Sequence, residues 1–205
     1  MKHTAVTVLS CLILVSAGFW ISARWSAAGF QARDWEDPAV FKRNQEEAHT
    51  PLMPYQTVEE ALRHERRSSV FYRSLNGIWK FNLAEVPEAS PADFGNPAYD
   101  DSRWSEIRVP GNWQMQGFDH PLFRNVHQPF PATPPYPPSN YNPVGCYRRG
   151  FTIPESWAGR TIFLHFEGVH SASYVWINGQ MVGYNEGGME PAEYNISSRI
   201  RSRRG

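Results

Sequence analysis

Cysteine is nearly absent from this 205-residue chain, which contains only Cys11 and Cys146. Cys11 lies in an apolar N-terminal run, so removal of that run would leave Cys146 alone and exclude an intramolecular disulfide. A single thiol between Gly145 and Tyr147 is more typical of a small buried packing residue than of a nucleophile. We therefore expect no disulfide and no cysteine chemistry in the mature chain.

Neither sign of charge is in excess, because 20 Lys and Arg balance 20 Asp and Glu. Nucleic-acid-binding proteins usually present a basic face, so nucleic acid is not an expected partner. The histidines and cysteines show no HxH, HExxH or CxxC spacing, and no metal site is predicted. GxSxG and a Gly-rich phosphate loop are missing, and no two carboxylates are placed to face one cleft. No catalytic residue is predicted.

Residues 1–28 have the pattern of an export signal. Lys2 precedes an apolar run that ends at Ile21, and small residues follow up to Ala28. We expect cleavage near Ala28 and an exported protein, periplasmic or extracellular. The alternative is a membrane anchor formed by residues 4–21, because an apolar run of about 17 residues is near the lower limit for crossing a bilayer. Only in that case would the chain contact a membrane.

Residues 29–70 are expected to form an extended arm with one short helix. In TVEEALRHERRSS, Thr57 can cap the helix N-terminus, and Glu60 follows three residues later as a capping box requires. The segment is very polar, which indicates a surface helix of one or two turns.

Residues 71–205 have the pattern of β-strands. Short apolar–polar alternations follow one another, for example Ile162, Leu164 and Phe166 on one face of a strand and His165 on the other, solvated face. Asn178-Gly179 joins two such runs, and this dipeptide strongly predicts a hairpin because both turn positions need positive φ. Short strands, long loops and almost no helix predict an all-β fold, a β-sandwich or jelly roll.

A proline-rich stretch, PLFRNVHQPFPATPPYPPSNYNPVGCYRRGF, covers residues 121–151 and holds eight prolines. It is too apolar for a flexible linker and too rich in proline for a helix or a central strand. Aromatic rings and amide side chains alternate in and just before it, and this combination suits a sugar, which packs C–H groups on rings and hydrogen bonds through hydroxyls. The other interpretation is that the rings only anchor the loop to its own sheet. The rings are Trp113, Phe118, Phe123, Phe130, Tyr136 and Tyr141, and the amides are Asn112, Gln114, Gln116, Asn125, Gln128, Asn140 and Asn142.

Several motifs resemble the N-terminal sugar-binding domain of glycoside hydrolase family 2, and within it the large bacterial β-galactosidases. They are RSLNGIWKF, VPGNWQMQGFDHPLFRNVHQPF, NPVGCYRRGFTIPESW, FEGVHSASYVWINGQMVGYNEG and EYNISSRI. The resemblance covers roughly residues 40–200. It implies a jelly-roll β-sandwich of the galactose-binding-domain-like type over residues 71–205, beside a barrel that carries the active site in the family.

The resemblance also implies the site residues. In the family, the asparagine of the Y-x-N-V motif lies close to the bound galactoside, and the matching residue in FRNV is Asn125. Trp113, Phe123 and His127 are further expected contacts of the same loop with the sugar. The implied partner is a β-galactoside sugar, held by an amide on a proline-stiffened loop at low entropic cost.

Other features of the family are expected to be missing from this chain. The barrel, its two catalytic glutamates and the family's magnesium and sodium ligands would lie beyond Gly205, and RSRRG replaces the strands expected after EYNISSRI. We therefore expect a jelly roll that is incomplete at its C-terminus, no cofactor in this chain, and no hydrolysis by this chain alone. Three interpretations stay open: a truncated β-galactosidase fragment, a free-standing carbohydrate-binding module, and an N-terminal fragment that complements a separately encoded remainder.

Overall fold

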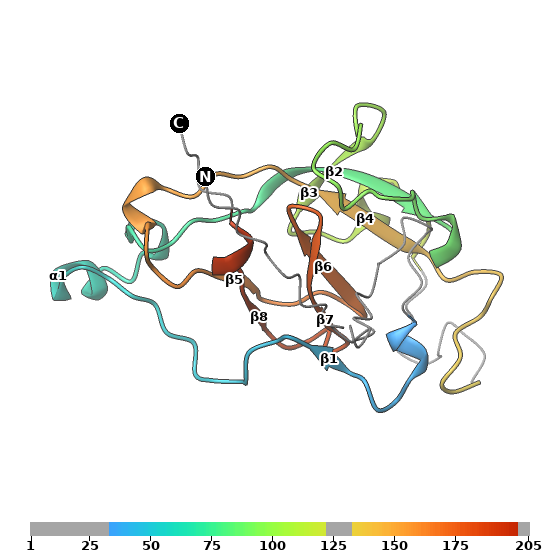
Figure 1. Ribbon diagram of the computed structural model, residues 1–205, viewed down its shortest axis with the longest axis horizontal. Coiled ribbons are helices and arrows are strands. Elements are labelled where there is room, and N and C mark those ends of the chain that lie inside the picture. Colours follow the sequence, from blue (N-terminus) through green and yellow to red (C-terminus); the bar gives the residue numbers. More distant parts are fainter. Residues whose placement is uncertain (1–32, 122–132, 201–205) are drawn as a thin grey trace, which may run out of the picture.

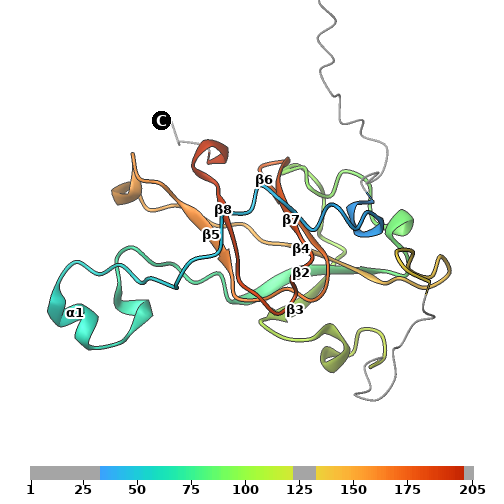
Figure 2. The same ribbon diagram turned by 90° about the horizontal axis from the view of Figure 1, so that it is seen from below.

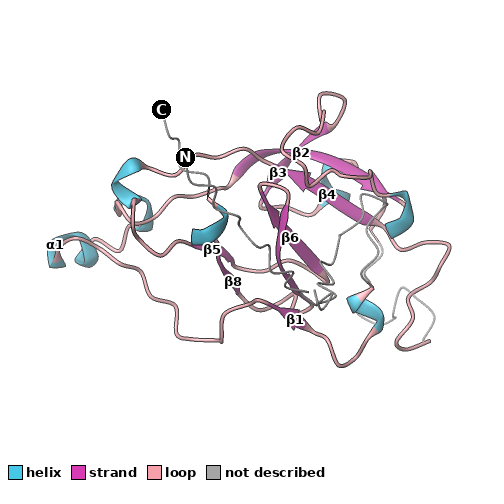
Figure 3. Ribbon diagram, in the orientation of Figure 1, coloured by secondary structure: helices cyan, strands magenta, loops and turns pink. Residues whose placement is uncertain are grey.

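The computed structural model describes residues 33–121 and 133–200, in which strands dominate and the helices are short (Figure 3). The strands are β1 (Lys42–Arg43), β2 (Gly77–Ala84), β3 (Ser105–Val109), β4 (Val144–Arg148), β5 (Phe163–Phe166), β6 (Ser173–Ile177), β7 (Gln180–Asn185) and β8 (Ala192–Asn195). The helices are α1 (Val58–Leu62) and the 3-10 turns η1 (Asp34–Glu36), η2 (Arg66–Ser68), η3 (Pro87–Ala89), η4 (Trp113–Gln116), η5 (Glu155–Trp157) and η6 (Ser197–Arg199). The predicted all-β class is confirmed. The expected signal or anchor at residues 1–28 lies outside the described residues.

The described strands form three antiparallel sheets (Figure 1). One has the order β1-β7-β6, the second β3-β2-β4, and the third pairs β5 with β8. The β6–β7 hairpin turns at Asn178 and Gly179, whose φ angles are 53° and 82°. Both values are positive, so the hairpin predicted from this dipeptide is confirmed.

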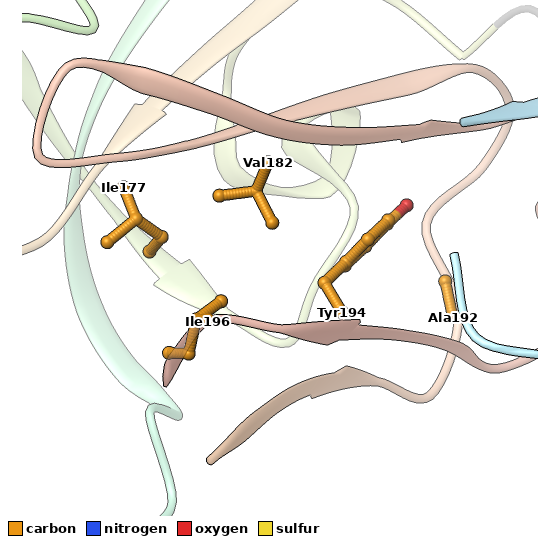
Figure 4. Packing of buried hydrophobic residues seen from close by; sticks show 5 residues of the cluster. All are labelled: Ile177, Val182, Ala192, Tyr194 and Ile196. Carbon is orange, nitrogen blue, oxygen red and sulfur yellow. The ribbon is translucent and has the colours of Figure 1, made fainter. Parts of the chain in front are cut away.

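One core cluster lies between the β6–β7 hairpin and β8. Figure 4 shows Ile177 and Val182 pointing from the hairpin toward Tyr194 and Ile196, which come from β8 and the residue after it. Leu164 and Phe166 of β5 pack against the same cluster, as their alternation predicted. Burial of this apolar surface holds the β5–β8 pair against the β1-β7-β6 sheet.

A second set of buried side chains belongs to the β3-β2-β4 sheet. Phe81 of β2, Ile107 of β3 and Cys146 of β4 are 1%, 2% and 1% exposed. Burial raises the pKa of the Cys146 thiol to about 11, which keeps it in the protonated, unreactive form. The prediction that Cys146 is a buried packing residue is confirmed.

The polar helix projects from one end of the molecule, away from the sheets (Figure 2). The Thr57 hydroxyl accepts a hydrogen bond from the Glu60 N–H at 3.2 Å, and the Glu60 carboxylate accepts one from the Gln56 N–H at 3.1 Å. The predicted cap is confirmed, with the return bond made one residue earlier than in the standard capping box.

The segment before this helix takes part in a sheet. Lys42 and Arg43 of β1 pair with Asn185 and Tyr184 of β7. The Arg43 guanidinium also donates two hydrogen bonds of 2.8 Å to the carboxylate of Asp34, which is 8% exposed. This bidentate pair fixes the residues before β1 to the sheet.

Candidate functional site

The part of the chain that precedes the proline-rich stretch is anchored on Phe81. The ring of Phe118 meets Phe81 edge to face, with centroids 4.7 Å apart, and Trp113 and Tyr147 lie at 6.1 and 4.8 Å. Such aromatic pairs are stabilised beyond the area that they bury. For Trp113 and Phe118, packing against their own sheet is therefore part of their role.

Gln116 attaches η4 to the end of β3. Its side-chain oxygen accepts a hydrogen bond from the Arg108 N–H at 2.8 Å, and its amide nitrogen donates to the Arg108 carbonyl at 3.0 Å. These are the two backbone hydrogen bonds that a neighbouring strand would make with Arg108. The Gln116 amide therefore holds η4 on β3 and is already hydrogen bonded, so it is not a candidate for binding a sugar hydroxyl.

Trp113 lies against Gly145 of β4, and only glycine can occupy that position of the strand. A Cβ atom at Gly145 would be 2.7 Å from Cζ3 of Trp113 and 2.9 Å from Cε2 of Phe81. Among the described residues, the buried indole N–H of Trp113 has no hydrogen-bond partner. The contact of Trp113 with a sugar remains a prediction.

The two sides of the proline-rich stretch meet at Asp119, His120 and Tyr141, which we name the Asp119 brace. The Tyr141 hydroxyl lies 2.8 and 2.7 Å from the two carboxylate oxygens of Asp119, and the His120 Nδ1 lies 2.9 Å from one of them. The rings of His120 and Tyr141 are stacked, with centroids 5.8 Å apart. Residues 22 positions apart in the chain therefore form one polar cluster.

Three of the four predicted sugar contacts, Asn125, Phe123 and His127, lie outside the described residues. Tyr136, on the far side of the stretch, is 63% exposed, and its backbone is held by a turn with Thr133. The structure thus gives the frame on both sides of the predicted contacts.

The family of the chain follows from comparison with known proteins. A family model described as "Glycosyl hydrolases family 2, sugar binding domain" matches residues 72–204. The chain belongs to glycosyl hydrolase family 2. The match includes β2 to β8, η4 and both sides of the proline-rich stretch, so the Asp119 brace is part of the family 2 domain.

The curated relatives are longer proteins. A protein named β-galactosidase from Priestia megaterium is 45% identical over 173 residues, which are 82% of this chain and 17% of that relative. A second one, from Psychromonas ingrahamii, is 42% identical over 172 residues, 84% of this chain and 16% of the relative. The chain spans about one sixth of the length of these relatives.

One solved structure that matches in part is Bacteroides uniformis β-glucuronidase 2 covalently bound to cyclophellitol-6-carboxylate aziridine. It is 25% identical, with a TM-score of 0.46, and the match covers 64% of this chain and 13% of that one.

The described residues contain a second polar cluster, which the sequence pattern did not predict. Glu193 of β8 lies between His49 and His165, with Oε2 2.9 Å from His49 Nε2 and Oε1 2.7 Å from His165 Nδ1. His165 is on the face opposite Leu164 and Phe166, as predicted, but it is hydrogen bonded to Glu193. The cluster ties the segment after β1 to the β5–β8 pair.

This cluster predicts a pH dependence. His49 Nδ1 lies 2.9 Å from the Thr50 carbonyl oxygen, so both ring nitrogens face acceptors and only the protonated ring can donate to both. The contacts with Thr50 and Glu193 raise the pKa of His49 above its ordinary value. Its contribution to stability is therefore complete below about pH 6.5 and is lost as the pH rises through the raised pKa.

Urea unfolding of the wild type and of His49→Gln at several pH values between about 5.5 and 8 checks this. The wild type should lose stability across this range and the variant should lose less. NMR titration should show the pKa of His49 falling in Glu193→Gln. An unchanged pKa in that variant would contradict the role of Glu193.

An open hollow of about 460 Å³ is lined by residues that follow β1, by Val182 of β7 and by residues around η6. The residues of the Asp119 brace do not line it. Among residues 33–121 and 133–200, no group of three or more His, Cys, Asp or Glu side chains could hold a metal ion. Within the same ranges, the helices are too short or too polar to cross a membrane. None of these features points to a second chemical site in the described residues.

Proposed function

We propose that this domain binds terminal β-D-galactosides as the N-terminal part of a β-galactosidase. The observation that carries the proposal is the 45% and 42% identity to two proteins named β-galactosidase over more than four fifths of this chain. Membership in the sugar-binding family agrees with it. The finer architecture that we propose is a jelly-roll β-sandwich, to which the three antiparallel sheets contribute.

The proposed contact with the sugar is made by Asn125. It lies in the chain between Asp119 and Tyr141, whose side chains are held together at the base of the proline-rich stretch. An amide both donates and accepts, so Asn125 can bind two neighbouring hydroxyls of a galactoside. Phe123, His127 and the accessible part of Trp113 are proposed as further contacts.

Catalysis is proposed to belong to the longer enzyme and not to this chain. Hydrolysis of a glycoside needs two carboxyl groups that flank the bond, and we propose that the remainder of the enzyme supplies them as a partner. The magnesium and sodium ligands expected for the family are proposed to lie in that remainder too. Export through residues 1–28 is the proposed localisation, with an anchor at residues 4–21 as the alternative. Turnover of a chromogenic β-galactoside by the purified chain alone would contradict this division.

Replacing Asn125 by alanine is expected to weaken galactose and lactose binding about tenfold or more, because the hydrogen bonds of the amide to the sugar are lost. Isothermal titration calorimetry of the full chain, with thermal unfolding in the presence of each sugar, measures the change. Ligand binding raises the unfolding temperature of the wild type, so the shift should shrink in the variant.

Gln56→Ala is the control, since Gln56 is an exposed amide outside the proline-rich stretch. It should bind galactose like the wild type. Equal loss in both variants would contradict a specific role of Asn125. A wild type that binds neither galactose nor lactose would overturn the proposed function itself.

A further inference from the structure

The segment that leads from β1 to α1 is attached at two points whose contacts involve no titrating group (Figure 2). At the first, the Glu46 N–H donates a hydrogen bond of 2.9 Å to the carbonyl of Glu193 in β8. At the second, the Pro54 carbonyl accepts a hydrogen bond of 2.6 Å from the Ser69 hydroxyl. Residues 48–53, which we name the strap, lie between these two points.

One side chain attaches the strap itself. In the described part of the chain, the only hydrogen bond from the strap to another element is the contact of His49 Nε2 with Glu193 Oε2 at 2.9 Å. Residues 48–52 are exposed and Met53 is only half-buried, so apolar packing holds the strap weakly. Its position therefore depends on the contact between His49 and Glu193.

The charges around His49 make this contact depend on the proton of the ring. The titratable groups that face the pair are Glu193 of β8, His165 of β5, whose Nδ1 lies 2.7 Å from Glu193 Oε1, and Glu46 beside the strap. Burial would raise the pKa of Glu193, but the hydrogen bonds with both histidines bring it below its ordinary value. The carboxylate is thus ionised at neutral pH, and the charge of Glu46 also favours a protonated His49.

The two acceptors around the ring define what changes when the proton leaves. A protonated His49 donates to the Glu193 carboxylate and to the Thr50 carbonyl oxygen, which lies 2.9 Å from Nδ1. A neutral ring has one N–H, so one of these contacts becomes a pair of acceptors. The remaining contact has also lost the positive charge that strengthened it.

We propose that His49 is a pH-sensitive tether, which holds the strap on β8 when the ring is protonated and releases it when the proton is lost. The attachments at Glu46 and Pro54 stay in place, so release is local and the sheets remain folded. Loss of a hydrogen bond between charged groups changes the ratio of held to released strap about tenfold or more. The inference stands apart from the proposed function, because no sugar takes part in it.

NMR relaxation of backbone carbonyl carbons in the full chain tests the tether, since these carbons carry no proton that exchanges with water. Because the contacts of His49 raise its pKa, the wild-type strap should be held at about pH 5.5 and released at about pH 8. Its order parameters should fall from about 0.85 to below about 0.6, while those of β2 stay near 0.85. In His49→Gln the side chain does not titrate, so the strap should show the same mobility at both pH values.

His64→Gln is the control, because His64 is an exposed histidine beyond the strap. It should keep the pH dependence of the wild type. A wild-type strap with equal order parameters at both pH values would overturn the inference, and so would an equal change in wild type and His49→Gln. Mobility that rises in the strap and in β2 together would also overturn it, because the role of His49 would then lie in global stability alone.

Discussion

Replacing Gly183 by alanine is expected to lower the free energy of unfolding by about 3 kcal/mol, at the upper end of the usual cost of overpacking. A Cβ atom at this position of β7 would be 2.3 Å from Cε1 of Tyr194 and 2.6 Å from the Arg43 carbonyl oxygen. Tyr194 is 0% exposed and cannot swing into solvent. The Arg43 oxygen belongs to the backbone of β1, so the pairing of β1 with β7 would have to move.

Urea unfolding followed by tryptophan fluorescence measures this change, since the slope of the transition shows whether the same surface is exposed in both proteins. Gly150→Ala is the control, because nothing lies within 4 Å of the position that its Cβ would take and its φ is not in the left-handed region. That variant should be as stable as the wild type or slightly more stable. Equal stability of Gly183→Ala and wild type would show that β1 and Tyr194 can yield at no cost.

Features fixed by neighbours in the chain were predictable from the sequence. The hairpin at Asn178-Gly179 needs only two residues that tolerate positive φ, and the helix cap needs only Thr57 and Glu60 three positions apart. The alternation of Leu164 and Phe166 likewise indicated the buried face of β5, because side chains alternate along a strand. These signals are local, and the fold class followed from their sum.

Features that join distant residues were not predictable in the same way. Asp119 and Tyr141 are 22 positions apart, and Glu193 and His49 are 144 apart. No periodicity marks such pairs, because the fold alone brings them together. The need for glycine at Gly183 is of the same kind, since a ring of β8 and a carbonyl of β1 define it. The predicted sugar contact Asn125 came from resemblance and remains to be tested by binding.

Replacing Phe81 by alanine is expected to lower the free energy of unfolding by about 3–5 kcal/mol, the usual cost of truncating a buried phenylalanine. Phe81 is 1% exposed and carries the rings of Trp113, Phe118 and Tyr147. Phe163→Ala is the control, because Phe163 is also in a strand but is 48% exposed. It should lose about 1 kcal/mol or less, since surface substitutions have small effects. Equal losses in chemical denaturation would contradict the role of Phe81 as the centre of the stack.

The milder variant Phe81→Leu extends this test to function, because the protein is expected to remain folded. Leucine fills part of the space but cannot reproduce the edge-to-face contact with Phe118. If β2 supports the proposed sugar site, Phe81→Leu should weaken galactose binding, because Phe118 packs on Phe81 directly before the Asp119 brace. If it lowers stability while galactose affinity stays at the wild-type value, the proposed sugar site does not depend on β2.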